Sequence, residues 1–138
     1  MPQQPVTFSL NPIGYIRSSL DELAAAPHQG GEGAPDAWIE LAPQYAEGLT
    51  GLSSGDELIV LAWFHLADRS KLVIHPRGDR DRPLTGVFAT RSPHRPNPIG
   101  MHRVTVREID GNRLRVGPIE AVDGTPIVDI KIAIGNDD

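Results

Sequence analysis

Residues 102–116 read HRVTVREIDGNRLRV, and this stretch decides the fold class. Apolar and polar residues alternate on both sides of the turn at residues 110–112. Alternation with period two puts every second side chain on one face of a strand, and Asp-Gly is a strong hairpin signal. The stretch therefore predicts two antiparallel strands, residues 102–109 and 112–116, joined by a tight turn.

The same kind of pattern continues on either side of this hairpin. Glycine and proline, 14 and 13 of 138 residues, separate short β-like runs, so we expect many strands and few helices. Residues 58–66, LIVLAWFHL, are almost wholly apolar, as in a strand buried on both faces, although nine residues alone do not exclude a buried helix. The other expected strands cover residues 13–18, 37–41, 71–75, 86–90 and 127–132.

The segments between these strands are expected to be loops with short helical turns. Residues 19–26 predict one or two helical turns, with Ser19 as N-cap and Glu22 three residues later. Residues 27–35 predict a glycine-rich loop, and residues 43–52 a loop with a helical turn. No glycine-rich turn of Rossmann type is present. We predict an all-β fold, a single closed or nearly closed β-barrel over residues 1–138 with its core at about 11–131.

Composition narrows the possible chemistry and location. The chain has no cysteine, which excludes disulfides, thiolate-ligated zinc, iron–sulfur clusters and a cysteine nucleophile. No apolar run approaches the roughly 20 residues that a spanning helix needs. The start MPQQP lacks the basic and apolar parts of a secretory signal. We therefore expect a cytoplasmic protein that does not enter a membrane.

The net charge of −5 is unevenly distributed along the chain. Residues 1–64 carry one basic and eight acidic residues, and residues 108–138 carry three basic and seven acidic residues. Residues 65–107 instead carry nine basic and three acidic residues, a net charge of +6. A basic band inside an acidic protein indicates an anion site, unless its arginines pair with the acidic flanks.

The segment 91–100, RSPHRPNPIG, is the strongest candidate for a functional loop. Its three prolines fix the backbone, so the polar side chains between them are presented at low entropic cost. Those side chains are Arg91, Ser92, His94, Arg95 and Asn97. These side chains predict a binding site for a polar ligand. The alternative is a stiff corner of the barrel whose arginines donate hydrogen bonds to nearby carbonyls.

Several motifs are similar to one known family. The chain reads GVFATRS at 86–92, RPNPIG at 95–100 and VDGTPIVDIK at 122–131, with PIGYIRS at 12–18 and WFH at 63–65. It therefore resembles the TrmO family, also called TsaA, over residues 11–131. The resemblance implies a β-barrel methyltransferase that uses S-adenosylmethionine to methylate the exocyclic nitrogen of threonylcarbamoyladenosine beside the anticodon of tRNA. It also implies a homodimer with the cofactor near the subunit interface.

The resemblance implies cofactor contacts at four places in the chain. They are Gly30, Gly31 and Glu32 in the first loop, His65 and Leu66 at the end of the apolar strand, Arg91 and Met101 around the proline-rich loop, and Asp123, Gly124, Thr125 and Pro126 in a turn. Arg91 suits the cofactor carboxylate as a bidentate partner. We expect Arg77, Arg80, Arg82, Arg95 and Asn97 to contact tRNA.

Two features depart from the family pattern. Longer bacterial members have a C-terminal domain that is not part of this sequence, so tRNA affinity is expected to come from the barrel or its partner subunit. After residue 131 the family continues with Pro-Tyr, whereas this chain has Ile132 and Ala133. The resemblance therefore does not carry a tyrosine contact over to this position.

A general base would help methyl transfer, because the acceptor nitrogen is a poor nucleophile while it holds its proton. The candidates are Asp129, Asp123 and His94, with His65 as a further one, and the enzyme could use none of them. Three alternatives stay open: a methyltransferase of another substrate, a non-catalytic nucleotide- or RNA-binding barrel, and a metal hydrolase. The last is disfavoured because the histidines at 65, 75, 94 and 102 match no metal-binding spacing, so we expect no metal.

Overall fold

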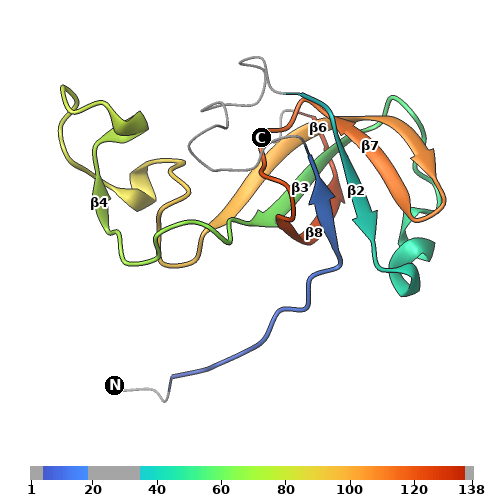
Figure 1. Cartoon of the computed structure of the whole chain (residues 1–138), viewed down its shortest axis with the longest axis horizontal. Helices are drawn as coiled ribbons and strands as arrows, with labels where there is room; N and C mark the ends of the chain where they lie inside the picture. Colours follow the sequence, from blue (N-terminus) through green and yellow to red (C-terminus); the bar gives the residue numbers. More distant parts are fainter. Residues whose placement is uncertain (1–4, 19–34, 136–138) are drawn as a thin grey trace.

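In the computed structural model, residues 5–18 and 35–135 are described, and six antiparallel strands form a closed barrel (Figure 1). Going round the barrel, the order is β1 (Gly14–Arg17), β2 (Ala37–Leu41), β7 (Arg113–Gly117), β6 (Ile99–Asp110), β3 (Glu57–Trp63) and β8 (Pro126–Ile132). The prediction of an all-β barrel is confirmed. The helical turns predicted at 19–26 lie outside the described residues, as does most of the loop predicted at 27–35.

The decisive hairpin forms as its alternation predicts. Along β6 the side chains of His102, Val104 and Val106 point inward and are buried, while their neighbours are more exposed. Gly111 has a φ of 63°, the left-handed conformation that the tight turn to β7 requires. The β6–β7 register shifts between Val106 and Glu108, and such a bulge increases the local bend that barrel closure needs.

The apolar strand β3 lies between β6 and β8 in the barrel wall and pairs with both. Its inward side chains join a core whose most deeply buried members come from every strand of the barrel. Fully buried examples are Ile16, Ile39, Leu58, Leu114 and Ile127. The strand ends at Trp63 rather than at Leu66. The amide of Phe64 still donates to the carbonyl of Pro98 at 2.8 Å, but Pro98 has no N–H to donate back, and the carbonyl of Phe64 instead accepts from the amide of Ala67 in a turn.

An arm projects from one side of the barrel between β3 and β6 (Figure 1). This β4–β5 arm, residues 71–90, holds β4 (Val73–Ile74), the 3₁₀ turn η3 (Pro76–Gly78), β5 (Thr85–Gly86) and the 3₁₀ turn η4 (Val87–Ala89). A further 3₁₀ turn, η2 (Pro43–Leu49), follows β2. None of the helical turns in the described residues is long and apolar enough to cross a membrane.

The prediction of a strand at 86–90 is wrong. Only Gly86 belongs to β5, and residues 87–89 form η4. The carbonyls of Val87 and Thr90 accept hydrogen bonds from the guanidinium of Arg95, so they are satisfied without a neighbouring strand. The strand expected at 71–75 is shorter than predicted, and β6 begins three residues earlier than predicted, at Ile99.

Candidate functional site

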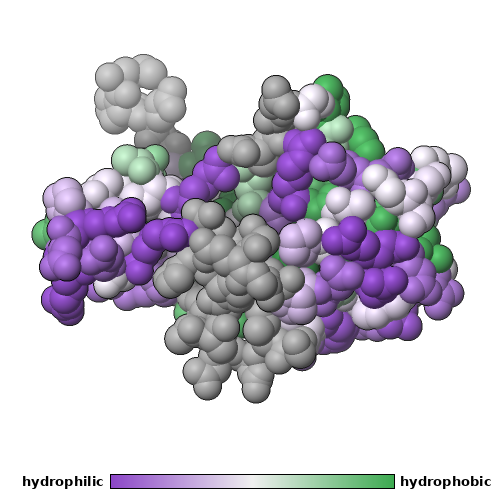
Figure 2. Space-filling model, turned by 90° about the horizontal axis from the view of Figure 1, so that it is seen from above, coloured by the Kyte–Doolittle hydropathy of each residue, from purple (hydrophilic) through white to green (hydrophobic). Residues whose placement is uncertain are grey.

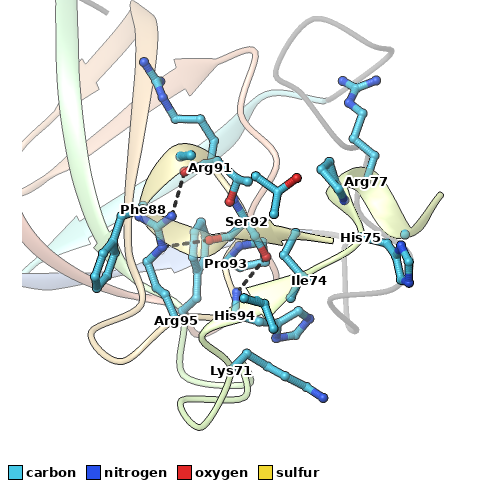
Figure 3. A pocket seen from close by; sticks show the side chains of 18 of the residues that line it. Lys71, Ile74, His75, Arg77, Phe88, Arg91, Ser92, Pro93, His94 and Arg95 are labelled. Atoms are coloured by element: carbon cyan, nitrogen blue, oxygen red, sulfur yellow. Dashed lines mark hydrogen bonds between the residues drawn. The ribbon is translucent and has the colours of Figure 1, made fainter. Parts of the chain in front are cut away.

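A wide cleft separates the β4–β5 arm from the rim of the barrel (Figure 3). Its volume of about 1830 Å³ exceeds the roughly 300–1,000 Å³ of ordinary small-molecule pockets, so one small ligand does not fill it. The barrel rim contributes Phe64, Met101 and His102 to its lining, and the proline-rich loop contributes Arg91 and His94. One wall is therefore largely apolar, and another is polar and cationic.

The apolar wall contains one polar atom without a partner. His102 is buried, its Nε2 has no hydrogen-bond partner, and its ring meets that of Phe64 edge-on with centroids 5.7 Å apart. Burial lowers the pKa of His102 from 6.5 to about 4, so the imidazole is neutral at pH 7. Gly100 makes this packing possible, because a Cβ there would overlap the ring of Phe64.

The proline-rich loop is held together by Arg95. Its Nη2 donates to the carbonyls of Val87 and Thr90, the latter at 2.7 Å, and its Nε donates to the carbonyl of Ser92 at 3.0 Å. A planar guanidinium with several donors in fixed directions suits this role, and a lysine could not replace it. Arg95 thus fixes the backbone on both sides of Arg91, which lies at the exposed lip of the cleft.

The outer side of the loop is tied to the turn that follows β3. Arg69 donates to the carbonyl of Pro96 at 2.7 Å and to Oδ1 of Asn97 at 3.3 Å, and it lies over the ring of Trp63. The amide of Asp68 donates to Nδ1 of His94 at 2.9 Å. Asn97 and Arg95, both expected to contact tRNA, therefore make hydrogen bonds within the loop assembly.

The hydrogen bond to His94 decides its tautomer. Because Nδ1 accepts from a backbone amide, a neutral His94 carries its proton on Nε2. The ring lines the cleft and so offers a hydrogen-bond donor there, rather than the lone pair that a general base needs. Asp68, which holds His94, is itself anchored: hydrogen bonds from the hydroxyl and amide of Ser70 hold the pKa of Asp68 below its usual value.

The other two predicted catalytic residues lie elsewhere. Asp129 lines a smaller hollow of about 310 Å³ at the end of the barrel where β3 begins, beside Tyr45 and Ile130. One of its oxygens accepts from the amide of Ile130 at 2.8 Å. Asp123 lies in the turn before β8 and accepts from the amide of Ser18 at 3.1 Å. Neither carboxylate lines the cleft.

The predicted cofactor residues fall into two groups. Leu66, Arg91 and Met101 line the cleft, and His65 lies next to Leu66 in the turn after β3. The second group, Asp123, Gly124, Thr125 and Pro126, forms the turn into β8 and does not line the cleft. Gly124 has a φ of 84° there and donates to the carbonyl of Ile16. Gly30, Gly31 and Glu32 lie outside the described residues.

The arginines expected to contact tRNA phosphates lie on the β4–β5 arm. Arg77, Arg80 and Arg82 line the outer part of the cleft, and Arg82 is 3.7 Å from a carboxylate oxygen of Asp79. Figure 2 shows hydrophilic residues gathered over this arm, at the left of the view. On the barrel, Arg17 and Arg115 pair with acidic side chains at 2.7 and 2.9 Å.

Sequence reasoning did not identify His102, Phe64 or Phe88 as residues of the site. His102 occupies an inward position of β6 in a series of otherwise apolar inward positions. This polar residue in an apolar series is the sequence feature that could have identified it as a residue of the site. Phe88 is exposed on η4 and lines the cleft, which only the correct placement of η4 reveals. Among the described residues, no three histidine or acidic side chains converge as a metal site would require.

Three comparisons place this geometry among known proteins. Residues 15–138 match the family described as the tRNA-methyltransferase O N-terminal domain. A Pyrococcus horikoshii protein, named as a probable S-adenosyl-L-methionine-binding protein, is 43% identical over 129 residues, covering 91% of this chain and 82% of its own length. The S-adenosyl-L-methionine-binding protein of Archaeoglobus fulgidus is 41% identical over 122 residues, with 88% and 86% covered.

A crystal structure of TrmO from Pseudomonas aeruginosa has the same fold. The TM-score is 0.76 at 37% sequence identity, and the match covers 95% of this chain. It covers 56% of the TrmO chain, so the present chain spans a little over half the length of that protein.

The buried histidine generates a prediction about pH. Because the pKa of His102 is about 4 in the folded protein and 6.5 when unfolded, protons bind the unfolded state preferentially as the pH falls from 6.5 towards 4. We expect the free energy of unfolding to drop by about 2 kcal/mol more between pH 7.5 and 5 in the parent than in His102→Leu. Urea unfolding measures this, with the exposed-site variant His65→Gln as control. Equal losses in the parent and His102→Leu would contradict the assignment.

Proposed function

Because this chain belongs to the tRNA-methyltransferase O N-terminal domain family, we propose that it is an S-adenosylmethionine-dependent methyltransferase of tRNA. The methyl acceptor proposed is the exocyclic nitrogen of threonylcarbamoyladenosine next to the anticodon. One observation carries the proposal: a rigid loop holds Arg91 at the lip of a cleft whose floor is the apolar rim of the barrel. The proposed domain is a single barrel unit over residues 1–138.

The residues of the cleft fit S-adenosylmethionine. Arg91 would hold the carboxylate, as a charge-assisted partner on a backbone that Arg95 keeps in place. Leu66, Met101 and Phe64 offer apolar contact to the adenine ring and to the aliphatic carbons beside the sulfonium. When bound, the cofactor supplies an activated methyl group, which the acceptor nitrogen takes as it releases its proton.

Positioning is the main catalytic contribution that these side chains can make. His94 offers an Nε2–H donor to the cleft, which suits the carbonyl oxygen of a urea-like acceptor and would orient it. Asp123 and Asp129 remain candidate bases only if a further element brings them to the acceptor, because neither lines this cleft. We therefore propose that His94 orients the acceptor and that the proton leaves to water.

A second copy of the chain is proposed to complete the site. The cleft is open and larger than one cofactor, and the turn at 123–126 lies outside it. In a homodimer with the cofactor near the interface, the turn of one subunit can face the cleft of the other. A tRNA substrate would place this dimer in the cytoplasm.

Methyl transfer to tRNA tests the function directly. We expect the purified protein to transfer labelled methyl groups from S-adenosylmethionine to tRNA that carries threonylcarbamoyladenosine, and not to the same tRNA made without that modification. Methylation of both tRNAs would indicate another acceptor. Cofactor binding without transfer to either would favour a non-catalytic binding barrel.

Removal of the Arg91 guanidinium should weaken cofactor binding. Losing one charge-assisted pair costs about 1.5–3 kcal/mol, so we expect the Kd for S-adenosylmethionine to rise roughly ten- to hundred-fold in Arg91→Ala. The matched control is Arg107→Ala, which removes a barrel arginine that lies 3.5 Å from Asp36. Isothermal titration calorimetry of both variants makes the comparison, and an unchanged affinity in Arg91→Ala would exclude the assigned role.

Binding of tRNA should depend on salt through the β4–β5 arm. If about three or four phosphates are neutralised, the logarithm of affinity falls with the logarithm of salt at a slope of roughly −2 to −4. Replacing Arg77, Arg80 and Arg82 by alanine should flatten this slope and leave cofactor affinity nearly unchanged. The control triple variant, Arg17, Arg107 and Arg115 to alanine, removes the same charge from arginines of the barrel wall. Equal slopes in the two triple variants would contradict the assignment.

A further inference from the structure

The residues before β1 form an extended segment without cover. In this N-terminal extension, residues 5–12, the apolar side chains of Val6, Phe8 and Leu10 alternate with polar ones and are 82%, 77% and 51% exposed. Figure 1 shows the segment leading away from the barrel. Within the described part of the chain, backbone hydrogen bonding to the barrel begins only at Ile13, whose amide donates to the carbonyl of Ile127 at 2.8 Å.

A run of three large apolar side chains at alternate positions is suited to packing along a surface as a strand does. The barrel cannot take an added strand, because its six strands close on themselves. The sheet formed by β4 and β5 has two strands and is open at both edges. Among the described strands, it is therefore the surface that an extended segment can join.

That sheet belongs to an arm with its own uncovered apolar side chains. Leu72, Val73, Leu84 and Phe88 are each more than half exposed, and Phe88 reaches 82%. The N-terminal extension is uncharged, so it can lie beside the basic arm without repulsion or an unpaired charge. Two sets of apolar side chains that need cover are thus present in one chain and do not cover each other.

We propose that the N-terminal extension of one copy of this chain packs along the β4–β5 arm of a second copy, and that the second copy returns the same contact. This inference rests on the proposed homodimer and assigns the segments that form it. In a two-fold dimer the extension of each subunit packs on the arm of the other. The apolar side chains of both extensions and both arms are then covered, and the symmetry limits the assembly to two copies. Aromatic side chains bury roughly 150–250 Å² each, so Phe8 and Phe88 supply a substantial part of the about 800 Å² per partner that a stable interface needs.

The contact would also shape the site. Val73, Leu84 and Phe88 line the cleft as well as carrying exposed apolar surface. An extension packed against them adds a wall from the second copy to a cleft that is too wide for one small ligand. The cofactor-binding site of one subunit would then be narrowed by residues 5–12 of its partner.

Sedimentation of matched variants tests the contact. Phe8→Asp places a charge on the apolar side of the extension, and Ser9→Asp places the same charge on its other side. Because the same buried phenylalanine is lost from two symmetric contacts, we expect the dimer Kd to rise by at least about a hundred-fold in Phe8→Asp. We expect a change of less than about threefold in Ser9→Asp and loss of the dimer when residues 2–12 are removed.

The outcomes separate this inference from the proposed dimer. A parent protein that sediments as a monomer at micromolar concentration overturns both. A dimeric parent whose Kd is unchanged by Phe8→Asp and by the truncation overturns only the role of the extension. Because Phe8 is exposed in the single chain, its substitution should leave the fold of the subunit intact, and the far-ultraviolet circular dichroism spectrum of each variant is measured to establish this.

Disulfide trapping distinguishes exchange between copies from a contact within one chain. The parent has no cysteine, so single cysteines can be placed without background. We expect a mixture of Phe8→Cys and Leu72→Cys proteins to give a two-chain species on oxidation, more than a mixture of Ser9→Cys and Leu72→Cys. A chain carrying both Phe8→Cys and Leu72→Cys that oxidises only within itself would show that the extension folds back, and would overturn the proposal.

Discussion

The fold depends on closing a six-stranded ring through one short contact. β1 and β8 meet through only two residue pairs. The amide of Ile13 extends this contact by donating to the carbonyl of Ile127 in β8, and the amide of Ile16 donates to the carbonyl of Thr125 just before β8, both at 2.8 Å. Gly14 lies at the junction, and a Cβ there would overlap the backbone of Glu40 and Leu41. A side chain at this position would force β1 away from β2. Once the ring is closed, its core excludes water, and the chain between β3 and β6 must leave the wall as an arm.

Closure of the barrel and the geometry of the site are linked at the rim. β3 and β6 pair up to Trp63 and Ile99, so the loop that precedes β6 and the turn that follows β3 are held side by side. Arg69 and His94 connect these two segments, and Arg95 connects the loop to η4. The result is a stiff unit that fixes the backbone on both sides of Arg91. The backbone that carries Arg91 is therefore ordered during folding rather than during binding.

Local pattern was sufficient for the barrel and insufficient for the arm. The hairpin of β6 and β7 and the apolar run of β3 were predictable because period-two alternation and continuous apolar sequence directly reflect burial on one or both faces. The segment at 86–90 was predicted as a strand because valine, phenylalanine and threonine favour strands. In the structure the side chain of Arg95, eight residues after Val87, donates a hydrogen bond to the carbonyl of Val87. The proline-rich loop was predicted as a site from its sequence. That Arg95 and Asn97 make hydrogen bonds within the loop and to the turn after β3 was not predictable, because these contacts depend on how the segments fold together. Asp123 and Asp129, candidates by residue type, were separated from the cleft by a topology that spacing does not reveal.

In the single chain the cleft is only partly enclosed, and exposed apolar side chains lie on the two segments that project from the barrel. An open cleft, an extension with alternating exposed apolar residues and an arm with four exposed apolar residues all occur on projections from a compact barrel. Folding does not cover these side chains, because the closed barrel has no free edge and its core is already filled. Exposed apolar surface of this extent is unfavourable in water unless another surface covers it. The association proposed above would both remove this surface from water and narrow the cleft, so that assembly and formation of the site would be one process.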